Sequence, residues 1–178
     1  FLYAFQRLAD PATAAPYAWI LNGRVKNGAD VIGGKKPVSE LGVSAPDDKT
    51  FVIELEYAQG YFLSLLGSVC EFTPQRQDIV EKYCTDYAAS ADKMMTYGPF
   101  TLTSSSNRQY VFEKNQDYWD ADSINFDRIE MSVIETGDTQ LAMYESGELD
   151  YVAVPTAQVP NYDDQDNEYM TGALDWVY

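Results

Sequence analysis

Two patterns of alternating apolar residues, one in each half of the sequence, constrain the fold of this chain most strongly. In residues 51–57 every second residue is large and apolar, and residues 41–45 precede them across a Pro-Asp-Asp-Lys turn. In the second half, residues 100–103 and 109–113 flank a serine-rich polar turn. A period of two residues places alternate side chains on opposite faces of a strand. Each pattern therefore predicts a β-hairpin, and the first hairpin is expected to have one apolar face.

Short helices are predicted around these hairpins. Phe1, Phe5 and Leu8 have helical spacing, and Asp10-Pro11 ends that helix. Asp138 is predicted to cap a helix that Gly147 ends. The same spacing predicts short helices at residues 17–21, 61–66 and 75–83, and a turn or short helix at 155–162.

Three further strands complete the expected secondary structure, at residues 128–133, 149–154 and 172–178, while residues 27–40 are expected to be mostly loop. The fold class is α+β, with mixed helices and strands and antiparallel or mixed sheets. A polar stretch at residues 85–93 separates the halves, so we expect two parts, residues 1–95 and 96–178. The first residues read as helix and the last as strand, which suggests an internal fragment of a longer protein.

The composition excludes several functions. The 178 residues contain 12 Lys plus Arg and 28 Asp plus Glu, a net charge of −16, which repels nucleic acid and anionic lipid. Histidine is absent, which removes imidazole-based catalysis and imidazole zinc ligands. No apolar run approaches the roughly 20 residues of a membrane span. With 46% hydrophobic residues the chain is expected to fold.

Other motifs are interpreted as structural. Glu54 and Glu56 share the solvated face of a strand, and nothing beside them suggests a catalytic pocket. Residues 163–168 are rich in Asp, but Tyr169 stands where a calcium loop needs glycine, so they predict a solvated loop. Tyr118-Trp119 is expected to pin a loop onto the sheet. No glycine-rich phosphate loop is present, and we predict no catalytic residue, metal or cofactor.

Cys70 and Cys84 are the two cysteines, and the sequence leaves their state open. In a reducing compartment they would be small buried residues. In an oxidising one they could close a disulfide loop of about 15 residues, which would contribute roughly 3 kcal/mol.

Several segments together resemble the oligopeptide-binding family of extracellular solute-binding proteins, family 5, which serve peptide ABC importers. In the first half these are residues 1–11 (FLYAFQRLADP), 13–18 (TAAPYA), 41–51 (LGVSAPDDKTF), 61–62 (YF) and 80–83 (VEKY). In the second half they are residues 98–102 (GPFTL), 113–120 (EKNQDYWD) and 144–150 (YESGELD). Each motif is short, but their order and spacing extend along nearly the whole chain.

The resemblance implies part of a clamshell of the type II periplasmic-binding-protein kind, with two sub-lobes. Residues 1–95 would belong to the small peripheral domain and residues 96–178 to the first ligand-binding lobe. Such a receptor captures oligopeptides outside the membrane and delivers them to permease subunits. The resemblance further implies an extracytoplasmic location, in the periplasm or on a lipid anchor at the outer face of the membrane.

The resemblance also suggests ligand-binding residues. Tyr17 matches a position near the bound peptide, and Tyr151, Ala153 and Val154 follow a motif that lines the cleft. Trp176 and Tyr178 share one face of the last predicted strand. Because the opposite lobe is not in this sequence, we expect the chain alone to bind peptide weakly or not at all. Unpaired strand edges are expected to favour self-association.

Three other functions remain as alternatives. One is a receptor for another solute, such as nickel, haem, a sugar or an opine, although the absence of histidine disfavours the first two. Another is a sensor or interaction module of the same fold without a role in transport. A hydrolase that uses paired carboxylates is the remaining class.

Overall fold

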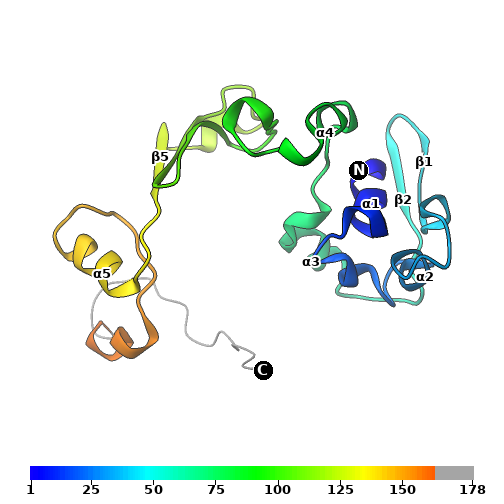
Figure 1. Ribbon diagram of the computed structural model, residues 1–178, viewed down its shortest axis with the longest axis horizontal. Helices are drawn as coiled ribbons and strands as arrows, with labels where there is room; N and C mark the ends of the chain where they lie inside the picture. Colours follow the sequence, from blue (N-terminus) through cyan, green and yellow to red (C-terminus); the bar gives the residue numbers. More distant parts are fainter. Residues whose placement is uncertain (163–178) are drawn as a thin grey trace. The chain divides into compact units, whose positions relative to one another are not determined.

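The computed structural model describes residues 1–162, which form two compact units, Phe1–Thr96 and a second that begins at Tyr97 (Figure 1). This division lies one residue from the boundary at residues 95 and 96 expected from the sequence. Both units combine short helices with antiparallel strands, so the predicted α+β class is confirmed.

The first unit consists of one hairpin, four α-helices and several 3-10 helices. The α-helices and strands are α1 (Leu2–Ala9), α2 (Gly28–Ile32), β1 (Val43–Asp47), β2 (Thr50–Ile53), α3 (Phe62–Ser68) and α4 (Gln77–Tyr83). The 3-10 helices are η1 (Pro11–Thr13), η2 (Ala18–Leu21), η3 (Val38–Glu40), η4 (Cys70–Phe72), η5 (Cys84–Asp86) and η6 (Ala91–Lys93). The predicted hairpin and the helices near residues 1–9, 61–66 and 75–83 are confirmed, with shifted ends.

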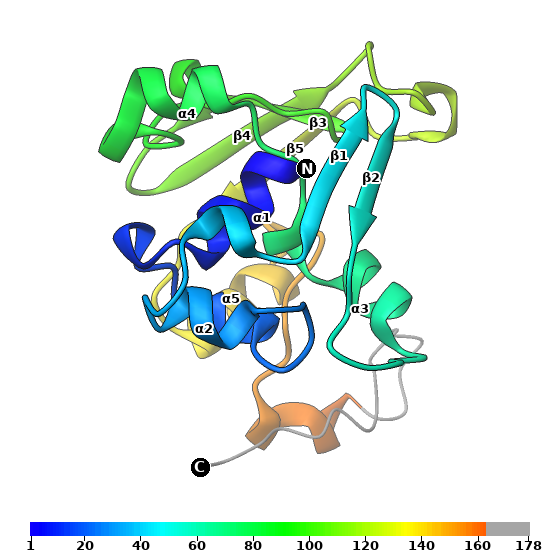
Figure 2. The same ribbon diagram turned by 90° about the vertical axis from the view of Figure 1, so that its right-hand side faces the viewer.

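Helix α1 organises the core of this unit. It lies against the β1–β2 hairpin (Figures 1 and 2) and buries Phe5, which is 1% exposed. The Phe5 ring stacks on Phe72 of η4, with centroids 5.0 Å apart, and packs on Phe51 of β2 at 5.3 Å. Burial of one such aromatic side chain stabilises a fold by roughly 1.5–3 kcal/mol. A single helical residue thus joins the hairpin to the segment before α4.

Gly42 permits a close backbone approach beside the hairpin. Its N–H donates to the carbonyl oxygen of Lys26 at 2.8 Å, and its own carbonyl accepts from the N–H of Glu54 at 2.7 Å. A β-carbon at position 42 would lie 2.6 Å from the β-carbon of Lys26. Only glycine fits at this position without a shift of the backbone.

The second unit contains a three-stranded antiparallel sheet and one α-helix within the described residues. Its elements are β3 (Phe100–Ser105), β4 (Gln109–Lys114), η7 (Ala121–Ser123), β5 (Arg128–Ser132), α5 (Gly137–Glu145) and η8 (Thr156–Asn161). The strand order is β3-β4-β5. The predicted second hairpin, third strand and turn at residues 155–162 are therefore confirmed.

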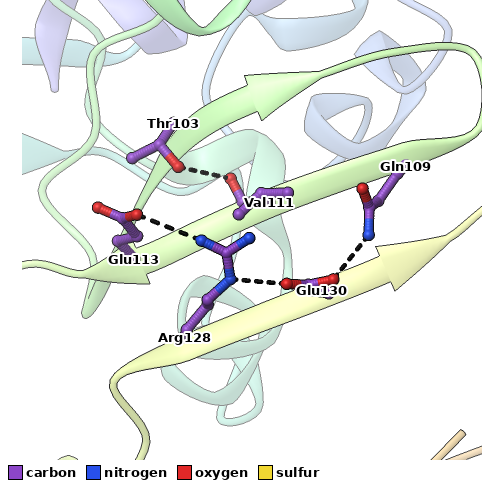
Figure 3. A network of polar contacts seen from close by, with 6 residues as sticks. All are labelled: Thr103, Gln109, Val111, Glu113, Arg128 and Glu130. Carbon is purple, nitrogen blue, oxygen red and sulfur yellow. Dashed lines mark hydrogen bonds and ion pairs between the residues drawn. The ribbon is translucent and has the colours of Figure 1, made fainter.

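The sheet has one polar and one apolar face. On the polar face the guanidinium of Arg128 contacts Glu113 at 3.5 Å and Glu130 at 2.7 Å, and Gln109 donates to Glu130 at 2.7 Å (Figure 3). A neighbouring hydroxyl, that of Thr103, bonds the carbonyl of Val111 at 3.3 Å. Exposed ion pairs of this kind contribute roughly 0–1 kcal/mol each, so they fix the register more than the stability.

The apolar face follows from the same register. Phe112 of β4 pairs with Leu102 of β3 on one side and with Ile129 of β5 on the other. Residues directly opposite each other in an antiparallel sheet share a face, so these three side chains form its apolar centre.

The structure corrects the predicted cap of α5. Thr136, not Asp138, is the N-cap, because its hydroxyl accepts from the N–H of Thr139 at 3.2 Å. Asp138 lies in the first turn, where a carboxylate also favours the helix dipole. Gly147, with φ +78°, ends the helix as predicted.

Other expectations need correction as well. Residues 28–32 form α2 rather than loop, because Gly28 has no side chain and fits against the backbone of Leu21. Residues 149–154 form no strand, since no neighbouring strand pairs with them within residues 1–162. Trp119 is 85% exposed and contacts the adjacent Tyr118, so it does not pin a loop onto the sheet.

The predicted helix at residues 17–21 is the 3-10 helix η2. The strand at 172–178 and the acidic loop at 163–168 lie outside the described residues.

The role of Phe5 predicts a measurable stability effect. Phe5→Ala should lower the free energy of unfolding by about 3–5 kcal/mol, because it removes ring contacts from both β2 and η4. Urea unfolding followed by circular dichroism measures this loss. The matched control is Leu63→Ala at a side chain that is 80% exposed, with an expected change within about 0.5 kcal/mol. Equal effects of the two substitutions would show that α1 does not organise the core.

Candidate functional site

The candidate ligand-binding residues fall into three places. Tyr17 belongs to the first unit, where it precedes η2, and its ring is 52% exposed. Tyr151, Ala153 and Val154 lie together in the second unit, between α5 and η8. The remaining two, Trp176 and Tyr178, lie outside the described residues. The structure therefore brings three of the six candidates into one segment.

The segment Asp150–Val154, which we call the linking segment, has free backbone groups. None of its N–H or carbonyl groups makes a hydrogen bond within the part of the chain that the structure describes. From Tyr151 to Val154 its side chains alternate between exposed and half-buried, and Tyr151 is 85% exposed. Pro155 follows directly and disfavours helical geometry at the preceding residue. The linking segment can thus offer several main-chain donors and acceptors to another peptide chain.

A surface pocket lies beside the end of the linking segment, between α5 and η8, which are the gold and orange helices of Figure 1. Its volume is about 470 Å³. One wall is formed by four residues of α5 with the spacing of a single helical face, and the other by three residues at η8. The lining residues are Asp138, Leu141, Ala142, Glu145, Gln158, Asn161 and Tyr162. The sequence analysis missed this pocket, because the helical spacing of the α5 residues does not show what lies opposite.

Hydrogen bonds fix one end of this α5–η8 pocket. The Tyr162 hydroxyl donates to a carboxylate oxygen of Glu145, and the Asn161 amide donates to Gln158 at 2.7 Å. The bond to Glu145 favours the protonated phenol and so raises the pKa of Tyr162 above its ordinary value of 10.0. Tyr162 and Glu145 thereby tie η8 to the last turn of α5.

The sequence after Arg128 is strongly acidic. It contains no lysine or arginine and eleven acidic residues, six of them among the described residues. Arg128 itself is engaged with Glu113 and Glu130. The carboxylate of Asp138 makes no ion pair or hydrogen bond with residues 1–162. The pocket is therefore an uncompensated negative site.

The other motifs considered in the sequence have structural partners. Glu54 forms an ion pair with Lys26 at 2.6 Å, which raises the pKa of that lysine, and Glu56 accepts from the N–H of Asn27 at 2.8 Å. Both carboxylates hold the hairpin to the preceding loop. Within the described residues, no group of three His, Cys, Asp or Glu side chains could hold a metal ion.

Cys70 and Cys84 are exposed free thiols in the structure. Cys70 donates to Glu71 at 3.4 Å, which raises the pKa of its thiol, and Cys84 donates to the carbonyl oxygen of Glu81 at 3.0 Å. The burial expected for reduced cysteines is not observed, and no disulfide joins them here.

Tyr17, the candidate ligand-binding residue of the first unit, has a neighbouring aromatic ring that the sequence analysis did not name. Its ring lies 6.4 Å from that of Trp19, which is 57% exposed. Two adjacent exposed aromatic rings provide a flat apolar surface with a polar edge, which suits contact with a peptide.

Comparison with known proteins identifies a consistent set of relatives. The sequence profile of the bacterial extracellular solute-binding proteins, family 5 (middle region), matches residues 1–177. The chain is 38% identical over 152 residues to the periplasmic oligopeptide-binding protein OppA of Salmonella typhimurium, covering 84% of this chain and 28% of the relative. It is 31% identical over 166 residues to the dipeptide-binding protein of Lactococcus lactis, covering 90% and 30%.

Solved structures show the same relationship. Listeria monocytogenes OppA bound to peptide superposes with a TM-score of 0.81 at 30% identity, over 93% of this chain and 32% of that chain. The oligopeptide ABC transporter substrate-binding domain of Bacillus anthracis gives 0.82 at 36% identity, over 93% and 32%. The chain spans about 30% of the length of the curated relatives that it matches. No helix within residues 1–162 is long and apolar enough to span a bilayer.

The contact between Tyr162 and Glu145 predicts a titration shift. Glu145→Gln removes the anionic acceptor, so the pKa of Tyr162 should fall toward its ordinary value of 10.0. Because the pKa is raised in the folded state, this contact stabilises the fold below pH 10 and is lost as pH rises through the raised value. Nuclear magnetic resonance of ¹³Cζ-labelled tyrosine measures the titration.

Glu148→Gln is the matched control for this titration, since it removes a neighbouring charge that does not bond Tyr162. It should leave the Tyr162 titration nearly unchanged. An unchanged titration in Glu145→Gln would contradict the contact.

Proposed function

The chain belongs to the bacterial extracellular solute-binding proteins of family 5, and from this premise we propose that it supplies one wall of a site that captures oligopeptides outside the membrane. The ligand would then pass to the permease subunits of an ABC importer. The relatives' names as oligopeptide- and dipeptide-binding proteins support this substrate class.

The observation that carries this proposal is the free backbone of the linking segment. A receptor for peptides of varied sequence cannot depend on particular ligand side chains, but every peptide carries main-chain N–H and carbonyl groups. An unpaired segment binds such groups by adding the ligand as a neighbouring strand. Water molecules in the pockets around the ligand side chains would then allow ligands with different residues to bind. Capture is binding and not catalysis, so we propose no enzymatic activity.

We propose that the two units correspond to the two parts expected from the family. Residues 1–95 would contribute to the small peripheral domain and residues 96–178 to the first ligand-binding lobe. In the latter, Tyr151, Ala153 and Val154 would contact the ligand, and in the former Tyr17 is the candidate contact. Trp176 and Tyr178 stay predictions, because they lie outside the described residues. Closure of the whole receptor on the ligand would take its energy from contacts made only in the closed state.

The cellular context follows from the same premise. We propose an extracytoplasmic location, in agreement with the periplasmic relatives, with a lipid anchor on the whole protein in organisms that have no outer membrane. The outer edge of β5 pairs with no other strand within the described residues, and it would allow the isolated chain to self-associate.

Main-chain recognition predicts a specific response to ligand methylation. Pentaalanine should bind the 178-residue chain with a dissociation constant weaker than micromolar, and shift the amide resonances of residues 150–154. Methylation of one engaged ligand amide should weaken binding by about fivefold to tenfold, because one main-chain hydrogen bond is lost. Titrations should therefore scan the methyl group over every amide of the peptide. Equal affinity at every position, or micromolar affinity without shifts at 150–154, would contradict the proposal.

Tyr151 predicts a side-chain contribution at the same segment. Tyr151→Ala should weaken pentaalanine binding by about threefold to tenfold, because apolar surface of the ring that the peptide buries contributes roughly 25 cal/mol per Å². Trp119→Ala is the matched control, since both rings are 85% exposed in the same unit. The same titration compares the two variants. A greater loss in Trp119→Ala would place the site elsewhere.

A further inference from the structure

The α5–η8 pocket is joined directly to the linking segment. Pro155, the next residue of the chain, packs against the start of α5, where a β-carbon on Gly137 would lie 2.9 Å from the proline Cγ. Asp138 is the following residue of α5 and lines the pocket. A peptide bound along the linking segment would therefore have the pocket within reach of one of its side chains.

The pocket combines an apolar floor with anionic ends. Leu141, 6% exposed, and Ala142 lie between the carboxylates of Asp138 and Glu145 on the same face of α5. Glu145 lies seven positions after Asp138, which is about 10 Å along a helix axis. Long basic side chains place their methylene stems on apolar surface and their charged ends beside acceptors.

The carboxylates lack a cation of their own. Glu145 gives one oxygen to the hydroxyl of Tyr162, and its other oxygen makes no hydrogen bond with residues 1–162. Asp138 is equally unpaired within that range, and the nearest preceding cation in sequence, Arg128, is held by two other glutamates. A positive charge from a ligand would thus meet no competitor among the described side chains.

We propose that the α5–η8 pocket is a side-chain subsite that binds a lysine or arginine of the captured peptide. This inference rests on the proposed function, because the peptide main chain at residues 150–154 delivers the basic side chain to the pocket. The subsite would give a receptor of broad specificity a preference for cationic peptides. Its strength would fall as salt screens the exposed carboxylates.

The test is a titration of the 178-residue chain, followed by amide resonances, with pentaalanine that carries one guest residue. The guest is lysine, norleucine or glutamate, moved through all five positions. At one position or more, lysine should bind about fivefold more tightly than norleucine, and glutamate more weakly than both. The lysine peptide should also shift amides of α5 and η8 that the norleucine peptide leaves unchanged.

Charge-removing variants identify the groups responsible. Asp138→Asn and Glu145→Gln together should abolish the preference for lysine over norleucine, which is a ratio of two affinities measured on the same variant. Glu135→Gln is the matched control, since it removes one exposed carboxylate close to α5 that does not line the pocket. It should keep most of the preference.

The outcomes separate this inference from the proposed function. Shifts at residues 150–154 without any preference for lysine would overturn the subsite and leave peptide binding intact. No shifts with any peptide would overturn both. If 1,5-diaminopentane alone shifts the pocket amides while the lysine peptides do not, the pocket binds free amines and the subsite is overturned.

Discussion

Every backbone amide needs a hydrogen-bonding partner, and the segments of this chain differ in whether they have one within the described residues. In the hairpins β1–β2 and β3–β4 the facing strands hydrogen-bond to each other. Gly42 adds a main-chain hydrogen bond to the loop at Lys26. The main-chain groups of the linking segment Asp150–Val154 make no hydrogen bond within the described residues. An unpaired segment of this kind offers the groups that main-chain recognition of a peptide uses.

Charge and shape then determine which peptides this segment would favour. Cations are concentrated before residue 129, and the helix that precedes the linking segment presents two unpaired or partly paired carboxylates around an apolar floor. Main-chain bonding alone would be indifferent to ligand sequence, whereas the acidic pocket adds a preference that depends on side-chain charge. The two features act at adjacent places in one unit, so affinity and selectivity can be measured on the same chain.

The sequence predicted local structure well where one pattern decides it. The alternation of apolar residues in 51–55 predicted β2. The spacing of Phe5 and Leu8 predicted α1 with its buried face. Caps and short helices were predicted less well, because Thr136 and Asp138 are both good N-caps and only the backbone geometry selects one. The strand expected at 149–154 failed for a different reason: a strand needs a neighbour, and pairing is a property of the whole fold.

The sequence proposed only part of the candidate site. The motif at residues 144–150 led to Tyr151, Ala153 and Val154, but sequence spacing could not reveal that Gln158 and Tyr162 face the acidic side of α5. The most direct test of the account is hydrogen–deuterium exchange of the linking segment, with and without saturating pentaalanine. Rapid exchange of the amides of residues 150–154 in the free chain, and protection of alternate amides in the complex, is the expected result. Amides already protected without peptide, or exchange unaffected by bound peptide, would contradict the account.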